Sequence, residues 1–128
     1  MLKLDYLYQN HDHRMHCKTL SVEHILPQNP APNSQWMKDF SPEERSVWTD
    51  RLGNLVLITR RKNSSLGNLD YSEKKEHYFE KCIDTCPNSL RVLRSYQAWT
   101  PSELGTNHKI VVGRLLEEYG VKPGNICP

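Results

Sequence analysis

The stretches LSVEHILPQ (Leu20–Gln28) and LGNLVLITRRKN (Leu52–Asn63) decide how this chain folds. Each holds a short apolar run bounded by turn residues, and this pattern predicts β-strands over residues 20–26 and 55–59. Pro27 is expected to end the first strand, and Gly53-Asn54 to form the turn into the second. Two strands followed by a helix would bring together four polar side chains, those of Glu23, His24, Asn54 and Asn63.

Two Ser/Thr-Pro motifs predict helix starts. Ser41-Pro42-Glu43-Glu44 places serine at the N-cap, proline at the first helical position and glutamate three residues after the cap, which is a capping box. We expect this helix to carry Val47 and Trp48 inward and to end near residues 51–53. Thr100-Pro101-Ser102-Glu103 repeats the signal and opens a long helix that Gly120 ends.

The other segments complete an α+β fold, in which a two-stranded antiparallel sheet is embedded in additional α-helices. Residues 2–9 form either a short helix or a strand, because the periodicity of their apolar residues fits both. The further expected elements are a short turn over 34–40 that Ser34 caps, helix starts at 63–66 and at Ser72, a loop over 82–87, a helix over 89–99 and a frayed tail over 121–128.

Length and composition indicate one folded domain. The chain has 128 residues, of which 37% are hydrophobic, and three Trp and six Tyr argue against disorder. The formal charge of +2 does not by itself require a nucleic-acid partner. No apolar run is long enough for a membrane span and no signal-peptide pattern is present, so we expect a cytoplasmic protein, or a nuclear one if eukaryotic. Because the chain starts abruptly, we expect a domain of a longer protein.

The segment His11-Asp12-His13-Arg14-Met15-His16-Cys17 has two interpretations. Imidazole and thiolate are zinc ligands, but the spacing matches no standard zinc motif, and a polar connecting loop is the simpler interpretation. The other three cysteines, Cys82, Cys86 and Cys127, form no Cys-x-x-Cys pair, so reduced thiols are expected.

The polar residues of the two stretches suit phosphodiester hydrolysis. Neutral imidazole is a competent general base at pH 7, which makes His24 the residue to activate water. The basic run Arg60-Arg61-Lys62 is placed to meet backbone phosphates, and Lys74 on the next helix adds a further contact. Taken singly, a histidine in a strand is usually structural, Gly-Asn is usually turn chemistry and a basic run is usually a solvated surface. Their ordered combination favours a nuclease site.

That combination resembles a known family. EHILPQ followed by RLGNLVLITRRKNSSLGNLDYSEKKEHY is similar to the HNH (His-Me finger, ββα-metal) nucleases, over residues 21–79 and more loosely toward Tyr119. It is closest to the C-terminal HNH domain of GmrSD-type modification-dependent restriction enzymes and also resembles the HNH module of RNA-guided CRISPR nucleases. The resemblance implies a single HNH domain over 1–128, with a ββα-metal core at about 20–80 and a helical extension at about 88–120.

The resemblance also implies roles for individual residues. His24 is the general base, oriented by a backbone carbonyl that a loop held by Asn54 presents. Glu23, the acid before the histidine, and Asn63, at the position of the family's final histidine, are the metal ligands. Their oxygen donors favour Mg²⁺ or Mn²⁺ over zinc. Such an ion would act as a Lewis acid, and the products would carry 5′-phosphate and 3′-hydroxyl ends.

The function implied is metal-dependent DNA cleavage with little sequence preference in a modification-dependent restriction or antiviral defence system. Other domains or subunits would supply DNA recognition and an NTPase. Glu23 replaces the aspartate common in other HNH branches, and zinc knuckles are lacking, which leaves open a catalytically weakened, nucleic-acid-binding module. A structural zinc protein built on His11, His13, His16 and Cys17 is a third alternative.

Overall fold

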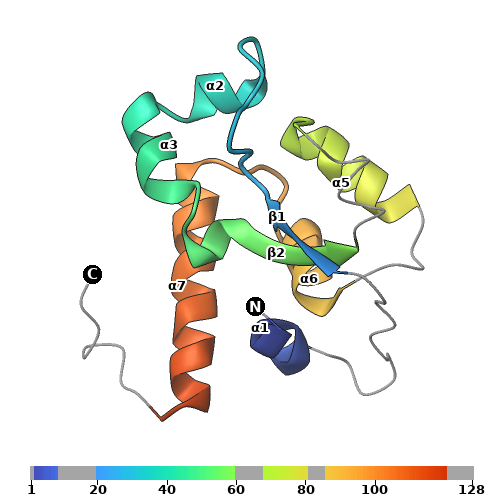
Figure 1. Ribbon diagram of the computed structural model, residues 1–128, viewed down its shortest axis with the longest axis vertical. Helices are drawn as coiled ribbons and strands as arrows, with labels where there is room; N and C mark the ends of the chain where they lie inside the picture. The colour runs from blue at the N-terminus through green and yellow to red at the C-terminus, as the bar shows by residue number, and fades with distance from the viewer. Residues whose placement is uncertain (1, 9–19, 60–67, 81–85, 121–128) are drawn as a thin grey trace.

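The computed structural model describes residues 2–8, 20–59, 68–80 and 86–120, and it is a mixed α+β structure (Figure 1). The described elements are α1 (Leu2–Leu7), β1 (Leu20–His24), α2 (Gln35–Asp39), α3 (Pro42–Trp48), the 3₁₀ turn η1 (Leu52–Asn54), β2 (Leu55–Thr59), α5 (Tyr71–Glu80), α6 (Pro87–Ser95) and α7 (Pro101–Glu118). The expected α+β class is confirmed.

The two strands form one antiparallel sheet, as expected. Their register pairs Leu20 with Thr59 at one end and His24 with Leu55 at the other. Strand β1 ends at His24, two residues earlier than the sequence predicts. The reason is that the side chain of Asn54 bonds both the N–H and the C=O of Leu26, which therefore leave the ladder.

The hairpin crosses the middle of the molecule, with α7 along one side, α5 along the other and α6 behind it (Figure 1). Strand β2 turns Val56 and Ile58 into the interior, where both are almost fully buried. The core around them is rich in aromatic side chains and consists of Ile25, Leu26, Trp36, Phe40, Tyr71, Tyr78, Val92, Leu93, Trp99 and Leu104. These aromatic and aliphatic side chains come from the hairpin and from the helices around it, so the helices and the hairpin form one packed unit.

The capping box of α3 is confirmed, because Oγ of Ser41 accepts from the N–H of Glu44 and the Glu44 carboxylate accepts from the N–H of Ser41. The inward position of Val47 is wrong, since 49% of this residue is exposed. Trp48, one residue on, does pack against the core. Consecutive residues on an α-helix point about 100° apart, so of two neighbours on this seven-residue helix one can face the core while the other faces solvent.

The later helices differ in detail from their predicted bounds. Helix α6 starts two residues earlier than expected, with proline at its first position, and ends four residues earlier because Tyr96 is extended. Thr100 does cap α7, but its hydroxyl bonds the Glu103 carboxylate and not a backbone N–H. Gly120 ends α7 with a φ of 69°, a conformation that glycine adopts without strain. None of the described helices is long and apolar enough to cross a membrane.

Candidate active site

The imidazole of His24 is held by a carboxylate that the sequence did not single out. Nε2 of His24 lies 3.0 Å from Oδ1 of Asp50, which comes just after the end of α3. The His24 side chain is 22% exposed, so solvent reaches it, and Asp50 is open at 81%. Because a carboxylate only accepts hydrogen bonds, this contact requires a proton on Nε2, and in the neutral ring Nδ1 is then the acceptor.

The side chain of Asn54 joins the two segments that carry this pair. Its Oδ1 accepts from the N–H of Leu26 at 2.8 Å and from the indole N–H of Trp99 at 3.0 Å. Its Nδ2 donates to the carbonyls of Leu26 at 3.0 Å and Thr49 at 2.8 Å. These four bonds use the full capacity of a primary amide, and Asn54 is completely buried. Asn54 therefore ties the chain beyond His24 to the residue before Asp50.

Gly53 lets η1 approach α7 at backbone distance. Its N–H donates to Nδ1 of His108 at 3.0 Å, and its carbonyl accepts from Nδ2 of Asn107 at 2.8 Å. A Cβ at Gly53 would lie 2.4 Å from Cα of His108, which no side chain tolerates without movement. Burial lowers the pKa of His108, and Arg51 lowers it further, in agreement with a neutral ring that accepts the Gly53 N–H. Helix α7 thus fixes the turn that holds Asn54.

Glu23 is buried in an ion pair with Lys74 of α5. The Lys74 ammonium donates to Oε1 of Glu23 and to the carbonyls of His24 and Ile25, both at 3.0 Å, so its three N–H groups are all used. The Trp36 ring lies beneath it, 5.9 Å from Nζ. Burial raises the pKa of Glu23 and lowers the pKa of Lys74, and their mutual attraction opposes both shifts.

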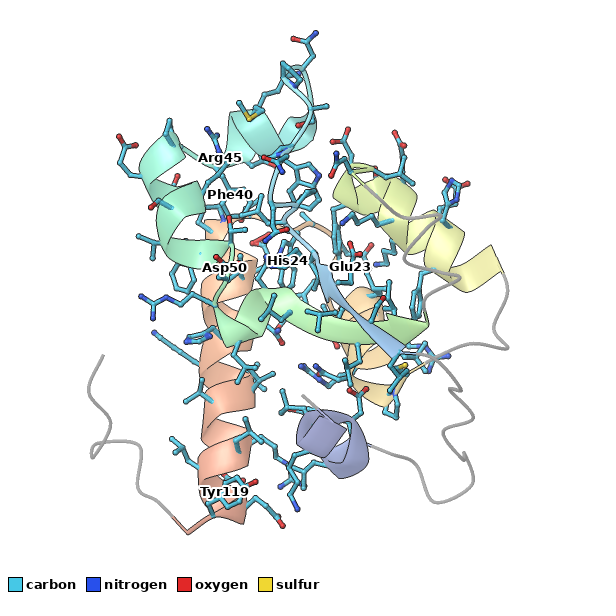
Figure 2. All side chains as sticks on the ribbon, viewed as in Figure 1. Glu23, His24, Phe40, Arg45, Asp50 and Tyr119 are labelled. Carbon is cyan, nitrogen blue, oxygen red and sulfur yellow. The ribbon has the colours of Figure 1, made fainter. Side chains whose placement is uncertain are left out.

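Glu23 and His24 face opposite sides of β1, as neighbours on a regular strand do. Figure 2 shows Glu23 directed toward α5, and His24 directed with Asp50 toward α3. The structure therefore groups His24 with Asp50 and Asn54, and Glu23 with Lys74. The expected surface contact of Lys74 with a phosphate does not match its position, since only 2% of Lys74 is exposed.

The remaining predicted site residues, Arg60, Arg61, Lys62 and Asn63, lie outside the described residues, as does the His11–Cys17 segment. Within the described ranges, no group of three or more His, Cys, Asp or Glu side chains is arranged to hold a metal ion. Cys86, the one cysteine in those ranges, is buried.

The contacts that Asp50 and Lys74 make with His24 and Glu23 were not predicted from the sequence. Asp50 is separated from His24 by 26 residues, and Lys74 from Glu23 by 51. A partial signal existed for Asp50, because it stands four residues before the asparagine expected to hold the loop that orients His24.

A family model describes this chain. The model of the C-terminal domain of GmrSD restriction endonucleases matches residues 1–110. The chain belongs to this family. The match runs from α1 into the second half of α7, so this GmrSD C-terminal domain includes the contacts of Asn107 and His108 with Gly53. Membership relates the chain to restriction endonucleases and hence to nuclease function. Searches of curated proteins and of solved structures found no match.

Proposed function

We propose that this GmrSD C-terminal domain is an HNH endonuclease with a ββα-metal core that hydrolyses DNA phosphodiester bonds. Strand β1, strand β2 and helix α5 would form that core. The observation that carries the proposal is the 3.0 Å contact between Nε2 of His24 and Oδ1 of Asp50 at a partly exposed strand end. An imidazole oriented in this way has the geometry that a general base requires.

Asp50 acts as a positioning residue for His24. By accepting the Nε2 proton it selects one tautomer and one ring orientation, so that Nδ1 is free to take a proton from water. The family resemblance predicted a backbone carbonyl in this role. A carboxylate has the additional effect of stabilising the imidazolium that forms once the proton is taken.

Asn54 positions the pair of His24 and Asp50 through the backbone. Its bonds to Leu26 and Thr49 fix the distance between the chain segments on which His24 and Asp50 lie. In this proposal Asn54 has no direct contact with substrate, because it is completely buried.

We propose that Glu23 and Asn63 hold a Mg²⁺ or Mn²⁺ ion. Carboxylate and amide oxygens are the donors that these ions prefer. When bound, such an ion supplies Lewis-acid stabilisation of the phosphate and the leaving oxygen. Binding at Glu23 would compete with Lys74 for Oε1. Arg60, Arg61 and Lys62 are proposed to contact backbone phosphates, leaving 5′-phosphate and 3′-hydroxyl products.

The partners proposed are DNA and further domains or subunits of a modification-dependent restriction system, which would supply recognition and NTPase activity. A second function, a nucleic-acid-binding module without strong catalysis, is favoured by two observations. Lys74 occupies the carboxylate that the metal would need, and Glu23 and His24 face opposite sides of β1.

A plasmid assay separates the two functions. Supercoiled DNA is incubated with Mg²⁺ and with wild type, His24→Ala or the control His77→Ala, which changes an exposed histidine on α5. Nicking by wild type and by the control, with a loss of at least about 100-fold in His24→Ala, supports the endonuclease. Retained DNA binding without any nicking by wild type supports the binding module, and equal nicking by all three proteins contradicts the role of His24.

A further inference from the structure

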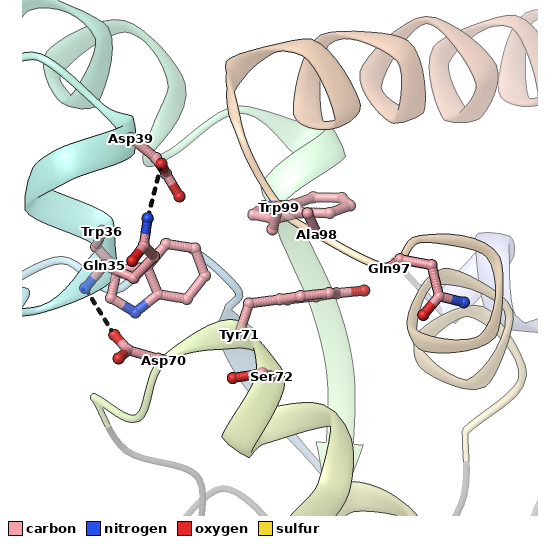
Figure 3. Close-up of a pocket in the computed structure, with 9 residues that line it drawn as sticks. All are labelled: Gln35, Trp36, Asp39, Asp70, Tyr71, Ser72, Gln97, Ala98 and Trp99. Carbon is pink, nitrogen blue, oxygen red and sulfur yellow. Dashed lines mark hydrogen bonds between the residues drawn. The ribbon is translucent and has the colours of Figure 1, made fainter.

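We propose that a pocket between α2, the start of α5 and the segment before α7 binds the guanidinium group of an arginine from a partner polypeptide. The pocket has a volume of about 200 Å³ and is lined by the rings of Trp36, Tyr71 and Trp99 and by two carboxylates, those of Asp39 and Asp70 (Figure 3). Nothing in the proposal depends on whether the chain cuts DNA.

The floor of the pocket is a rigid aromatic surface. Tyr71 stacks on Trp99 with ring centroids 5.7 Å apart and planes 19° apart, and Trp36 meets Tyr71 edge-on at 6.5 Å. The hydroxyl of Tyr71 and the indole N–H of Trp36 are both fixed by backbone carbonyls. Aromatic rings attract cations through the negative potential of their π systems. A floor of this kind therefore favours a cation over an anion.

The rim of the pocket carries negative charge with spare hydrogen-bonding capacity. Oδ1 of Asp39 accepts from the side chain of Gln35, and Oδ1 of Asp70 accepts from the backbone N–H of Gln35, each at 3.0 Å. No described residue donates to the second oxygen of either carboxylate. The side chains of Ser72 and Gln97, also on the rim, make no hydrogen bond within the described residues. Among the residues that the structure describes, no Lys, Arg or His lines the pocket.

These features select one ligand chemistry. A volume of about 200 Å³ is below the roughly 300–1,000 Å³ of small-molecule sites, so the pocket suits a single side chain and not a nucleotide. Two carboxylates repel the phosphate of a nucleic acid. Between the two cationic side chains, arginine fits better than lysine, because its planar guanidinium bonds carboxylates in a bidentate manner and stacks on aromatic rings.

The pocket shares two side chains with the candidate active site. The Trp36 ring lies 5.9 Å from Nζ of Lys74, and the Trp99 indole donates to Oδ1 of Asn54. An arginine seated between the carboxylates would thus contact the same two indoles that support the ion pair of Glu23 and the amide that positions His24. A partner polypeptide bound in the pocket would therefore stabilise the candidate active site through these two indole rings.

The test follows the indole N–H signals by NMR while N-acetyl-L-arginine amide is added to the full chain. We expect saturable shifts for Trp36 and Trp99 in the millimolar range, and none for Trp48, which lies outside the pocket. The neutral isostere N-acetyl-L-citrulline amide should shift neither signal. Equal shifts with citrulline, or equal shifts at Trp48, would overturn the proposal. So would shifts caused by a deoxynucleoside monophosphate and not by arginine, which would indicate a nucleotide site.

Three variants make the test specific. Asp39→Asn/Asp70→Asn should weaken arginine binding at least 10-fold, and Glu43→Gln, an exposed control on α3, should leave it unchanged. Asp70 also accepts from the backbone N–H of Gln35 at the start of α2, so its replacement could weaken binding by disturbing the fold. Gln97→Lys avoids this problem, because it places a competing cation at the rim and leaves both carboxylates unchanged. Unchanged binding in both pocket variants would refute the site. Free L-arginine should bind no more tightly than the amide, and tighter binding would indicate a metabolite site in place of a docking pocket.

Discussion

Removal of the Lys74 ammonium is the perturbation whose magnitude the structure defines best. Lys74 is 2% exposed and Glu23 5%, so Lys74→Met leaves a carboxylate buried without its cation. It also removes the donor to the carbonyls of His24 and Ile25. Breaking one side of a buried ion pair costs about 3–5 kcal/mol. Since a domain of this size is stable by about 5–15 kcal/mol, that loss is a large share of the total.

The assay is urea unfolding followed by circular dichroism, with a thermal melt beside it. We expect a lower urea midpoint and a Tm lower by roughly 10–20 °C. The control is Lys75→Met, the next lysine along α5, which is partly exposed and, within the described residues, donates a single hydrogen bond, to the carbonyl of Tyr96. That control should cost about 1 kcal/mol or less.

A double-mutant cycle with Glu23→Gln isolates the pair. The double variant should lose less stability than the sum of the single losses, because it contains no unpaired buried charge. If Glu23 is a metal ligand, Mg²⁺ should raise the Tm of Lys74→Met more than that of wild type. A loss below about 1 kcal/mol in Lys74→Met, or additive losses in the cycle, would refute the pairing.

Three further predictions concern stability. Gly53→Ala should destabilise the fold by about 1–3 kcal/mol in urea unfolding, because its Cβ would meet the α7 backbone at 2.4 Å. The control Gly113→Ala, with open space around it, should be neutral or slightly stabilising. Equal effects of the two variants would contradict the close approach of Gly53 to α7. Asn54→Ala leaves the Leu26 backbone and other buried groups unpaired and should cost at least about 3 kcal/mol, and a Tm within 2–3 °C of wild type, measured by melting, would contradict its linking role. Burial raises the pKa of Asp5 from 3.8 to about 6, so the folded state binds the proton more tightly than the unfolded state. The free energy of unfolding should therefore fall by roughly 2–3 kcal/mol as pH rises from about 4 to 7. Asp5→Asn should flatten this pH profile in urea unfolding, and an unchanged profile would contradict the prediction.

Local signals in the sequence were sufficient for several elements. The capping box at Ser41 and Glu44, the turn at Asn54 and the strand over 55–59 all formed as predicted, because each depends on residues a few positions apart. The end of β1 was predicted two residues too late. It depends on Asn54 bonding Leu26 from 28 residues away, which no local pattern reveals.

The polar pairs His24–Asp50 and Glu23–Lys74 could not be predicted from the sequence, because in each pair the two residues are far apart along the chain. His24 and Glu23 were identified from their place in EHILPQ, but their partners come from the turn after α3 and from α5. Asp50 follows a helix whose exposed face carries Val47, and Lys74 is one of two adjacent lysines that composition cannot distinguish. Only the packing of α5 against β1 shows that Lys74 is the buried one.

The tautomer of His24 is the most direct measurement of the central claim, that Asp50 orients this imidazole as a base. Long-range ¹H–¹⁵N NMR of the neutral ring should show the proton on Nε2 in wild type, and a mixture of both tautomers in Asp50→Ala. A wild-type ring protonated on Nδ1, or a spectrum that Asp50→Ala leaves unchanged, would contradict the account.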